Sequence, residues 1–396
     1  MLDKEIVIVG GARTPFGKFG GGLKDLTATD LAYLASKEAL HRSAVKPEEI
    51  DHVIFGNVMQ TSADAPYLAR HVGLRCEVPI PVPAYIVNRL CGSGFQAVIN
   101  GAQEILLGNA DEVLVGGTEA MSMAPHNVRG ARWGLKLGQA PMEDSLWATL
   151  TDSYCGASMA MTAENLAAQY EVSREEADEY AYRSHMLAHQ AWEEGHMQEE
   201  VVAVEVPGKK GMVRIERDEH IRPETNLESL AKLKPVFKMD GQVTAANSSG
   251  INDGAAALVL TTAASAKSRE VKPLGRLIAW AVKGVQPDIM GIGPAPASRE
   301  ALHRAGLKLE EMDLVEVNEA FASQYLAVER ELGLVREKTN INGGAIALGH
   351  PLGASGARIT LSLLYSLRRH KLRYGLASAC IGGGQGIALI VESFNH

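Results

Sequence analysis

The sequence predicts an α/β protein built from two similar halves, with a segment of different character inserted between them. The chain has 396 residues, which is too long for one ordinary domain and comfortable for two or three. Strand-like apolar runs alternate with helical patterns, an arrangement that favours a helix-covered sheet. Two stretches of the chain also match each other at a constant spacing, as expected for an internal duplication.

The duplication is clearest in residues 37–53 (KEALHRSAVKPEEIDHV) and 299–315 (REALHRAGLKLEEMDLV). Ten of these seventeen positions are identical, at a constant offset of 262 residues. The same offset pairs two further segments, Ser93-Gly94 with Ser355-Gly356 and residues 112–115 with residues 374–377. Three matches in register without a gap indicate two copies of one unit, which should pack about a pseudo-twofold axis.

Each copy predicts the same succession of elements. A helix is expected to end near Lys46 or Lys308, and a strand to follow at Val53–Phe55 or Leu314–Val317. A Gly-Ser-Gly or Gly-Ala-Ser-Gly turn then opens a second helix, and a last apolar strand ends in glycines, at Gly116-Gly117 or Gly382–Gly384. This alternation favours a mainly parallel sheet, with ligands bound at the carboxyl ends of its strands.

The segment between the two copies differs from both. Residues 121–245 are richer in Met, Trp and charge, and we interpret them as a subdomain inserted into the first half. They contain one strong helix, Ser173–Glu194, with Ser173 and Glu176 as a capping box. Strand-like residues then return to the first half. The expected division is therefore an N-terminal half of residues 1–120 completed by 246–272, an insertion of 121–245, and a C-terminal half of 273–396.

Composition and charge narrow the class of protein. The hydrophobic share of 46% and the charged share of 22% are ordinary for a soluble globular protein. A net charge of −8 argues against general nucleic-acid binding, but it is compatible with an anionic substrate held by local basic groups. The N-terminus runs into a strand-like segment without a basic leader, and no apolar run is long enough for a bilayer span. We therefore expect a soluble intracellular protein.

One of the four cysteines, Cys91, has the surroundings of a nucleophile. The cysteines form no C-x-x-C pair, so neither a zinc site nor a disulfide framework is expected. The segment N-R-L-C-G-S-G follows the strand-like A-Y-I-V and precedes a helical pattern at Phe95–Leu107. On such a strand-to-helix turn, the helix dipole and free N–H groups favour the thiolate. The structural alternative is a buried, inert thiol beside a tight turn.

Three further segments each contain a candidate catalytic residue. His350 lies in a glycine-rich turn before a helix and can take up and return a thiol proton near neutral pH. Cys380 ends a strand before a glycine run whose N–H groups suit an anion. Asn318 follows a strand and can orient water or an oxyanion. A loop histidine, a packed thiol and a helix cap are the structural alternatives, but together the residues supply a nucleophile, a base, a second acid or base, and polar donors.

With these residues in place, the chain resembles the thiolases over essentially its whole length. The motifs that carry the resemblance are N-R-L-C-G-S-G at Cys91, G-G-T-E-A-M-S at residues 116–122, N-E-A-F at Asn318, G-G-A-I-A-L-G-H-P-x-G-A-S-G at His350 and C-I-G-G-G-Q-G at Cys380. Segments such as Y-L-A-R-H-V-G-L-R are most similar to the 3-ketoacyl-CoA thiolases of fatty-acid β-oxidation. The resemblance implies an acyltransferase with a thiolase-like fold, in which mixed sheets form a layered α-β-α-β-α sandwich with an inserted loop subdomain.

The resemblance also implies a role for each candidate residue. Cys91 would attack the keto carbonyl of a 3-ketoacyl-CoA and carry the acyl group until free CoA removes it. His350 would activate Cys91 and, with a water held by Asn318, stabilise the enolate of acetyl-CoA. Cys380 would exchange the proton on the enolate carbon, and the N–H groups of Cys91 and Gly382 would form a second oxyanion hole.

Six more positions match substrate contacts of the family. Arg222 matches a residue near the adenine and phosphates of CoA, Ser249 matches one that touches the pantetheine, and the residues matching the acyl pocket are Met159, Phe237, Met290 and Phe321. CoA and acyl-CoA are thus implied as substrates, with no tightly bound cofactor and no metal. Acetoacetyl-CoA thiolases carry histidine where this chain has Ser158, which favours a 3-ketoacyl-CoA thiolase and keeps an acetoacetyl-CoA thiolase as the second choice.

Other classes of protein fit less well. A ketoacyl synthase would need a second histidine where Asn318 stands, and a Cys-His hydrolase would leave Cys380 without a role. A non-catalytic CoA-binding protein, the alternative from another class, predicts loss of catalytic groups that are all present. The resemblance further implies a homotetramer, assembled as a dimer of dimers, with residues 125–141 as candidate tetramer contacts. A cytoplasmic location is expected, or the mitochondrial matrix if the source is eukaryotic.

Overall fold

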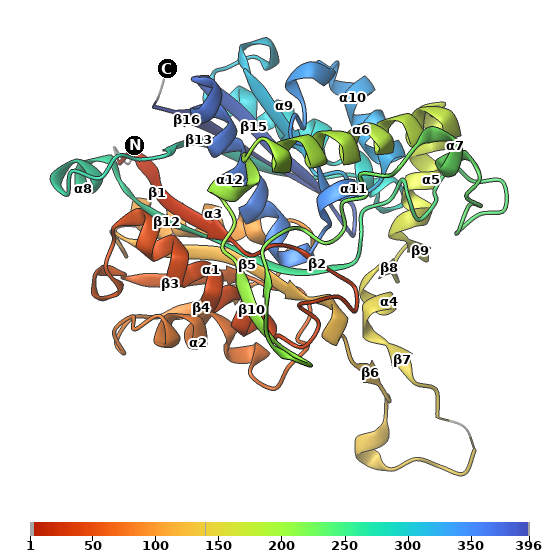
Figure 1. Cartoon of the computed structure of the whole chain (residues 1–396), viewed down its shortest axis with the longest axis horizontal. Helices are drawn as coiled ribbons and strands as arrows, with labels where there is room; N and C mark the ends of the chain where they lie inside the picture. The colour runs from red at the N-terminus through yellow and green to blue at the C-terminus, as the bar shows by residue number, and fades with distance from the viewer. Residues whose placement is uncertain (1–3, 139, 395–396) are drawn as a thin grey trace.

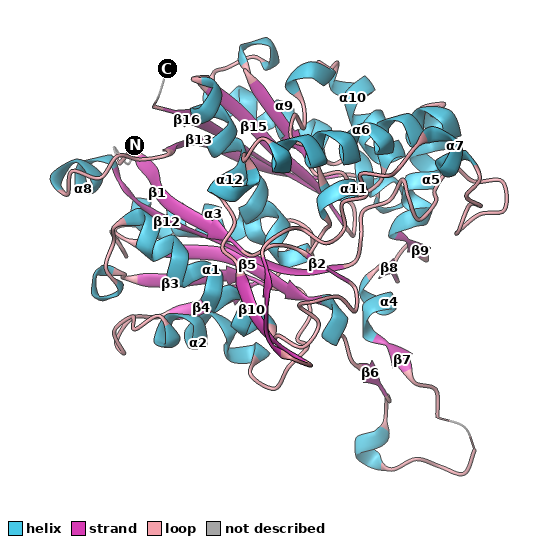
Figure 2. Ribbon diagram, in the orientation of Figure 1, coloured by secondary structure: helices cyan, strands magenta, loops and turns pink. Residues whose placement is uncertain are grey.

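The computed structural model describes residues 4–138 and 140–394. Within them, ten strands form one sheet that contains a set of strands from each half of the chain (Figures 1 and 2). The first half contributes, in spatial order, β4 (Ala84–Val87), β3 (His52–Gly56), β5 (Val113–Ala120), β12 (Asn252–Thr262) and β1 (Ile6–Arg13), with β2 (Gly17–Lys18) paired to β12. The second half contributes β13 (Gly275–Gly284), β16 (Gln385–Ser393), β15 (Tyr374–Ile381) and β14 (Leu314–Val317).

Apart from β4 and the short β2, the two sets of strands have the same order and the same directions, which fits the duplicated sequence. β3 is parallel to β5 and β14 to β15, whereas β12 and β16 run antiparallel to both of their neighbours. The expectation of a mainly parallel sheet is therefore wrong. Only residues 382–384 separate β15 from β16, a connection too short for the crossover that a parallel pair requires. These glycines form a hairpin turn and do not end the last strand.

Two central helices form a layer between the halves. α3 (Ser93–Leu107) and α12 (Leu352–His370) pack against each other, and each contacts strands of both halves. α1 (Ala28–Ser43) and α2 (Leu68–Arg75) cover the outer face of the first set of strands, and α9 (Pro294–Ala305) and α10 (Ala322–Leu332) cover that of the second. The layers follow the order α-β-α-β-α (Figure 2). This confirms the architecture that the resemblance implies.

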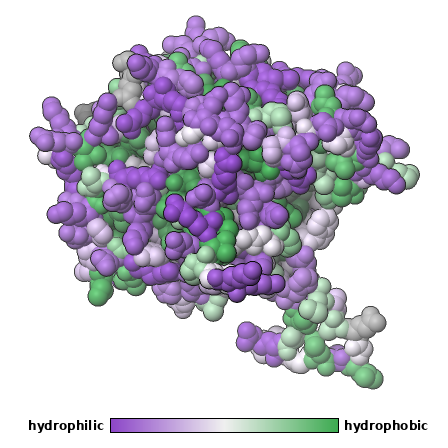
Figure 3. Space-filling model, viewed as in Figure 1, coloured by the Kyte–Doolittle hydropathy of each residue, from purple (hydrophilic) through white to green (hydrophobic). Residues whose placement is uncertain are grey.

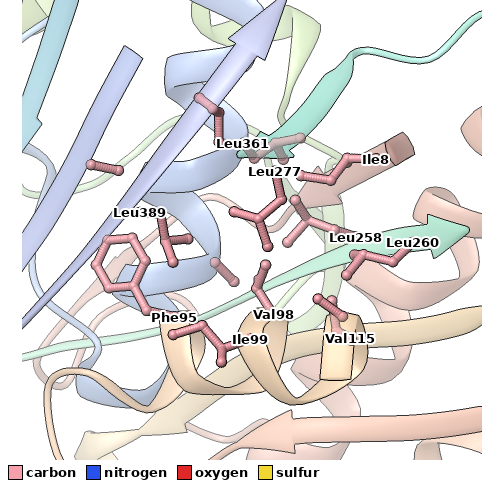
Figure 4. Close-up of a cluster of buried hydrophobic side chains, with 14 of the residues drawn as sticks. Ile8, Phe95, Val98, Ile99, Val115, Leu258, Leu260, Leu277, Leu361 and Leu389 are labelled. Atoms are coloured by element: carbon pink, nitrogen blue, oxygen red, sulfur yellow. The ribbon is translucent and has the colours of Figure 1, made fainter. Parts of the chain in front are cut away.

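Apolar side chains from both halves meet around the central layer (Figure 4). Phe95 and Val98 on α3, Leu361 on α12, Leu258 on β12 and Leu389 on β16 are all fully buried in one cluster. Burial of this kind is the main favourable contribution to folding, and it requires both halves to be present. The shared cluster therefore fixes one half against the other.

Glycines let the two central helices approach closely where their backbones cross. A Cβ atom added to Gly356 would lie 2.2 Å from the Phe95 nitrogen, and one added to Gly94 would lie 2.6 Å from the Ala357 nitrogen. The repeated Ser-Gly pair thus marks a helix crossing. In the second copy, the Gly-Ala-Ser-Gly sequence lies inside α12 and not in a turn before it, which corrects the expected turn.

Two further expected boundaries shift. α1 and α9 end before Lys46 and Lys308, because Ala44 and Gly306 take the left-handed conformation that stops a helix, with φ values of 54° and 67°. Gly117 lies inside β5 and not at its end. A Cβ atom added there would lie 1.9 Å from a main-chain oxygen of α12, so close packing against this helix requires glycine.

The inserted segment contains several short elements and two longer helices. Its elements are α4 (Ser145–Thr149), α5 (Met159–Gln169), α6 (Arg174–Glu193), α7 (Leu227–Ala231) and the hairpin pairs β6 (His126–Asn127) with β7 (Glu143–Asp144), β8 (Thr151–Asp152) with β9 (Ala157–Ser158), and β10 (Val204–Gly208) with β11 (Gly211–Ile215). The capping box is confirmed, because Ser173 Oγ accepts the Glu176 N–H at 3.1 Å and a Glu176 oxygen accepts the Ser173 N–H at 2.9 Å. An arm around β6 and β7 projects from the body of the molecule (Figure 1).

A buried ion-pair network fastens the inserted segment to β1. The Arg13 guanidinium lies 2.6 Å from a Glu200 oxygen and 2.6 Å from an Asp218 oxygen, and all three side chains are buried. Ser362 on α12 also donates a hydrogen bond to Glu200 at 2.7 Å. The insertion therefore contacts both the first half and the central layer. The division at residues 120, 245 and 272 stays a prediction.

Two short helices complete the α-helices of the described residues. α8 (Ala263–Ser268) follows β12, and α11 (Ala345–Leu348) lies just before α12. Within the described part of the chain, no helix has the length and apolar character needed to cross a membrane.

Candidate active site

Cys91 lies on the turn between β4 and α3, as the sequence predicts. Leu90, just before it, has a left-handed φ of 45°, which is uncommon for a side chain of this size. Two polar side chains fix this turn. Asn88 Oδ1 accepts the Leu90 N–H at 2.9 Å, while Ser93 Oγ accepts the Arg89 N–H at 2.9 Å and donates to the Leu90 carbonyl at 2.7 Å. The turn therefore holds Cys91 at the amino end of α3 at the cost of local strain.

The Cys91 thiol is buried but has backbone N–H groups beside it. Burial raises the pKa of this thiol to about 11, although N–H groups of Gly382 and of Cys91 itself act in the opposite direction by bonding to the sulfur. The charge of Glu119 adds to the rise. At neutral pH the resting thiol is therefore protonated, so its use as a nucleophile requires a base.

His350 supplies an imidazole in the required protonation state. It is buried in the turn between α11 and α12, where burial and the positive charge of Arg358 lower its pKa to about 3. Its Nδ1 lies 2.6 Å from Ser355 Oγ, and this hydroxyl also lies 2.9 Å from the Pro351 carbonyl, to which it donates. Because a hydroxyl has one hydrogen, Ser355 must accept from Nδ1–H. The lone pair is then on Nε2, which can act as a base.

Asn318 and a neighbouring asparagine position this imidazole further. Asn318 follows β14 directly, and its side-chain nitrogen lies 3.4 Å from His350 Nε2. Its Oδ1 is buried without a hydrogen-bond partner among the described residues, so it is available to a water or a substrate. On the other side, Asn252 Oδ1 accepts the His350 main-chain N–H at 3.1 Å.

Cys380 faces the same site from the second half. It is the second-last residue of β15 and is fully buried. Burial, together with the charge of a Cys91 thiolate, raises the pKa of the Cys380 thiol well above its usual range. The two thiols are thus close enough to interact electrostatically. Gly382 follows at the hairpin turn, with its N–H directed at the Cys91 sulfur. The structure therefore joins Cys91 to Cys380 and Gly382, and it joins His350 to Asn318. Cys91 also lies in one buried cluster with Leu352, two residues after His350.

Three of the acyl-pocket candidates gather around Cys380, and the fourth lies apart. Met159, Met290 and Phe321 pack in one apolar cluster with this thiol. Phe237 instead stacks on Trp147 with ring centroids 6.4 Å apart, outside this cluster. A hollow of about 300 Å³, lined in part by Leu90, Met159 and Gly382, opens beside the cluster. An apolar group of substrate can therefore lie in this hollow against Leu90 and Met159, each of which adjoins the site of one thiol.

The two candidate CoA contacts lie in different surroundings. Ser249 is half-buried and donates its main-chain N–H to the Ala320 carbonyl at 2.9 Å, so it lies beside the Asn318 turn. Arg222 is exposed, and its main-chain N–H donates to His185 Nδ1 at 3.2 Å. An exposed guanidinium suits a phosphate group, but among the described residues no hydrogen bond or ion pair joins Arg222 to the catalytic residues.

Comparison with known proteins identifies the family. Residues 6–264 match the family described as "Thiolase, N-terminal domain", and residues 271–393 match "Thiolase, C-terminal domain". The chain belongs to the thiolase family. As a thiolase, it is an acyltransferase.

Curated relatives and solved structures agree with this thiolase assignment. Human mitochondrial 3-ketoacyl-CoA thiolase is 56% identical, and the match covers 99% of each chain. Acetyl-CoA acetyltransferase from Syntrophomonas wolfei is 46% identical, over 99% of this thiolase and 100% of the relative. The crystal structure of the human mitochondrial 3-ketoacyl-CoA thiolase in complex with CoA superposes with a TM-score of 0.96 at 55% identity, covering 98% of each chain. The thiolase fold expected from sequence is thereby confirmed.

Sequence reasoning missed four polar residues that support the site of this thiolase. Ser355 and Asn252 accept hydrogen bonds from His350. Glu119 and Glu319 are fully buried carboxylates, one in each half of the chain. Glu319 accepts hydrogen bonds from the Tyr180, Ser184 and Asn340 side chains and the Ile346 N–H, between 2.6 and 3.1 Å. Three of the four lie within motifs used for the resemblance, but the motif letters alone do not reveal what each side chain contacts.

Proposed function

We propose that this thiolase cleaves 3-ketoacyl-CoA with free CoA, giving acetyl-CoA and a shortened acyl-CoA through an acyl group on Cys91. The observation that carries the proposal is the pairing of two buried thiols, Cys91 from the first half and Cys380 from the second, with the buried His350 close to Leu352 in the cluster of Cys91. The proposal is supported by the identity to 3-ketoacyl-CoA thiolases over nearly the full chain. The first step breaks a carbon–carbon bond and forms a thioester at Cys91, the second exchanges this thioester for an acyl-CoA, and the reverse of the first step is a Claisen condensation.

In the first step, His350 Nε2 takes the proton of the Cys91 thiol, and the thiolate attacks the keto carbonyl at C3. The developing oxyanion receives hydrogen bonds from the N–H groups of Cys91 and Gly382. When the C2–C3 bond breaks, its electron pair passes to the acetyl-CoA fragment as an enolate. The enolate oxygen is stabilised by His350 and by a water held at the free Oδ1 side of Asn318.

In the second step, the Cys380 thiol gives its proton to the enolate carbon, and acetyl-CoA leaves. The Cys380 thiolate then takes the proton of the thiol of a second CoA, whose sulfur attacks the acyl group on Cys91. The departing Cys91 sulfur recovers its proton from His350. A raised Cys380 pKa suits this role, since a protonated thiol is the donor that a carbanion-like centre needs.

The substrate contacts are proposed on the positions that match the family. Arg222 would bind near the adenine and phosphates of CoA, and Ser249 would contact the pantetheine. The acyl chain would lie among Met159, Met290 and Phe321, with Phe237 nearer the entrance. The first three already form an apolar cluster at Cys380, which supports their assignment. CoA and acyl-CoA are the only ligands this scheme requires, without a tightly bound cofactor or a metal.

Assembly and location are proposed separately from the chemistry. A homotetramer, assembled as a dimer of dimers, is supported by the projecting arm around β6 and β7, on which apolar residues gather (Figure 3). Trp133, Leu135 and Leu137 in this arm are exposed. For location, the cytoplasm stays the first expectation. The mitochondrial matrix is supported by relatives that are named mitochondrial.

Thiolysis rates for a series of 3-ketoacyl-CoAs from four carbons upward test the proposed substrate class. We expect kcat/KM to hold or rise with chain length beyond four carbons, because the apolar cluster offers a longer chain more buried contact. A sharp maximum at acetoacetyl-CoA would instead establish the acetoacetyl-CoA thiolase, which the 46% identity to an acetyl-CoA acetyltransferase favours as the second candidate.

The division of labour between the two thiols gives a separate prediction. Cys91→Ser should abolish thiolysis and acyl-enzyme formation. Cys380→Ser should still accept an acyl group on Cys91 but lose the exchange of acetyl-CoA α-protons with solvent, because serine is a much weaker acid than a thiol. Mass spectrometry of the acylated protein and NMR of the exchange check both outcomes. Wild-type exchange in Cys380→Ser would show that another group moves this proton.

A further inference from the structure

Glu119 is a buried carboxylate that the proposed reaction does not use. It lies near the carboxyl end of β5 and is fully buried. Four donors converge on it. Oε1 accepts the Asn57 side-chain amide and the Met59 N–H, each at 3.0 Å, and Oε2 accepts the Val58 N–H at 3.1 Å and the Gly353 N–H at 2.9 Å. This number of charge-assisted hydrogen bonds is what a buried carboxylate needs in order to be retained.

These donors come from two segments, each of which adjoins a different reactive group. Residues 57–59 follow β3, and Met59 packs in one buried cluster with Cys91. Gly353 lies in the first turn of α12, between His350 and its hydrogen-bond partner Ser355. One carboxylate therefore bonds both to the wall of the nucleophile's pocket and to the helix start that carries the base.

Main-chain packing leaves this junction almost no freedom to adjust. A Cβ atom added to Gly353 would lie 2.5 Å from the main-chain oxygen of Thr118 and 2.8 Å from that of Gly56. The start of α12 thus lies directly against β5 and the end of β3. Glu119 accepts the hydrogen bonds at this contact. If these bonds change, residues 57–59 and the start of α12 must therefore shift relative to each other.

The charge of Glu119 also acts on its surroundings. Two titratable groups interact with it electrostatically, Cys91 on the turn before α3 and Asp253 on β12. Burial raises the pKa of Glu119 to about 7, against the N–H groups that favour its ionised form. When Glu119 is ionised, its negative charge opposes ionisation of the Cys91 thiol.

We propose that Glu119 is a positioning residue of the thiolase reaction, which holds the pocket of Cys91 and the turn of His350 in one fixed relation. The inference rests on the roles proposed above for these two residues. It assigns Glu119 no contact with substrate. A small misplacement of reacting groups is costly, since a shift of about 1 Å can lower a rate about 100-fold.

Glu119→Gln tests the proposal because glutamine keeps the size but turns an NH2 group toward two N–H donors. We expect kcat for thiolysis to fall about 10- to 100-fold with a much smaller change in KM. We also expect the pH profile of Cys91 alkylation by iodoacetamide to move to lower pH, because a negative charge near the thiol is gone. A residue that only stabilised the fold would not produce this shift. Cys91→Ser protein defines the alkylation of the other thiols.

Glu119→Asp provides a second variant that keeps the charge and shortens the side chain by one methylene group. It should lower kcat without moving the alkylation profile, which separates geometry from charge. This variant also keeps the proposal testable if the glutamine variant does not fold.

Glu112, just before the same strand, offers a matched control. It is a buried carboxylate just before β5, at the opposite end from Glu119, and it accepts hydrogen bonds from Ser265, Thr261 and Arg269 at 2.5 to 3.0 Å. Glu112→Gln should lower thermal stability but leave kcat and the alkylation profile unchanged.

Either of two results would overturn the role of Glu119: wild-type kcat and profile in Glu119→Gln, or equal kinetic losses in both glutamine variants. Failure of the proposed function itself is distinguishable, since it would show as thiolysis by Cys91→Ser protein.

Discussion

Each reactive side chain of the site is neutral at rest, and burial is the common cause. Burial raises the pKa of Cys91 to about 11 and lowers that of His350 to about 3. Proton transfer from this thiol to this imidazole is therefore unfavourable in the empty site. It becomes favourable only as the thiolate attacks a carbonyl and its charge moves to an oxyanion held by N–H groups. Ionisation of Cys91 is thus coupled to its attack on the substrate. Because the resting thiol is protonated, it reacts slowly with other electrophiles.

Ser355→Ala should lower kcat about 10-fold or more, because it leaves the His350 Nδ1–H buried without a partner. An unsatisfied buried donor costs about 1–3 kcal/mol, and the imidazole could then turn or change its tautomer. Steady-state thiolysis and 15N NMR of the imidazole check the rate and the tautomer.

Ser366→Ala is the control for this substitution. Ser366 is a buried serine on the same helix that accepts a hydrogen bond from Asn342 at 2.9 Å, away from His350. A loss of kcat equal to that of Ser355→Ala would mean that any buried serine of α12 matters equally, which would contradict a specific role.

At the scale of elements, the crossing of α3 and α12 joins the two halves and carries both reactive ends. α3 begins just after Cys91, and α12 begins just after His350. The helices can cross only because Gly94 and Gly356 present no side chains at their contact. Related by the same offset of 262 residues, these glycines show that the duplication preserved the contact as well as the elements.

Gly356→Ala should destabilise the fold by about 1–3 kcal/mol, because the added methyl group meets main-chain atoms that cannot rotate away. Chemical denaturation monitored by circular dichroism measures the loss. Gly73→Ala on α2 is the comparison, since its Cβ would lie 3.1 Å from a movable Val53 methyl group. The gain in helix propensity at Gly73, about 1 kcal/mol, should offset the cost of moving this methyl group, so that stability stays nearly unchanged. Equal losses in both variants would contradict the importance of the crossing.

Elements and reactive residues were predictable from sequence where the signal is local. The turn of Cys91 and the helix after Ser173 follow from short patterns of strand, glycine and cap. The direction of β12 and β16 was not predictable in this way, because it depends on where each strand enters the sheet. The contacts of Ser355 and Glu119 were also hidden, since their partners are brought close by packing and not by spacing along the chain.

On the scale of the whole molecule, buried charges make stability depend on pH. Arg13, Glu200 and Asp218 form a paired network, whereas Glu316 on β14 has no ion pair within 4 Å among the described residues. Burial raises the pKa of Glu316 to about 8, although the positive charge of Arg358 acts against the rise. The folded state therefore keeps a proton that the unfolded chain, with its ordinary pKa of 4.5, releases.

Stability contributed by Glu316 should be present below about pH 4.5 and lost as the pH rises through about 8. Glu316→Gln removes this titration, so the unfolding free energy should decline less between pH 5 and pH 8 than in the wild type. Urea unfolding at a series of pH values measures the two slopes. The exposed carboxylate Glu310 serves as the control, and Glu310→Gln should keep the wild-type slope. Identical slopes in all three proteins would refute the prediction.

The place of β12 has a consequence for synthesis on the ribosome. β1 and β5 are made early, but the strand that lies between them is made only after the whole inserted segment. A nascent chain that stops before β12 therefore exposes two unpaired strand edges, which are prone to wrong pairing. The N-terminal half cannot close while it emerges, so it must wait for, or be shielded until, the arrival of a strand encoded far downstream. A gene cut after residue 120 would accordingly yield a fragment with an open sheet and not an independent domain.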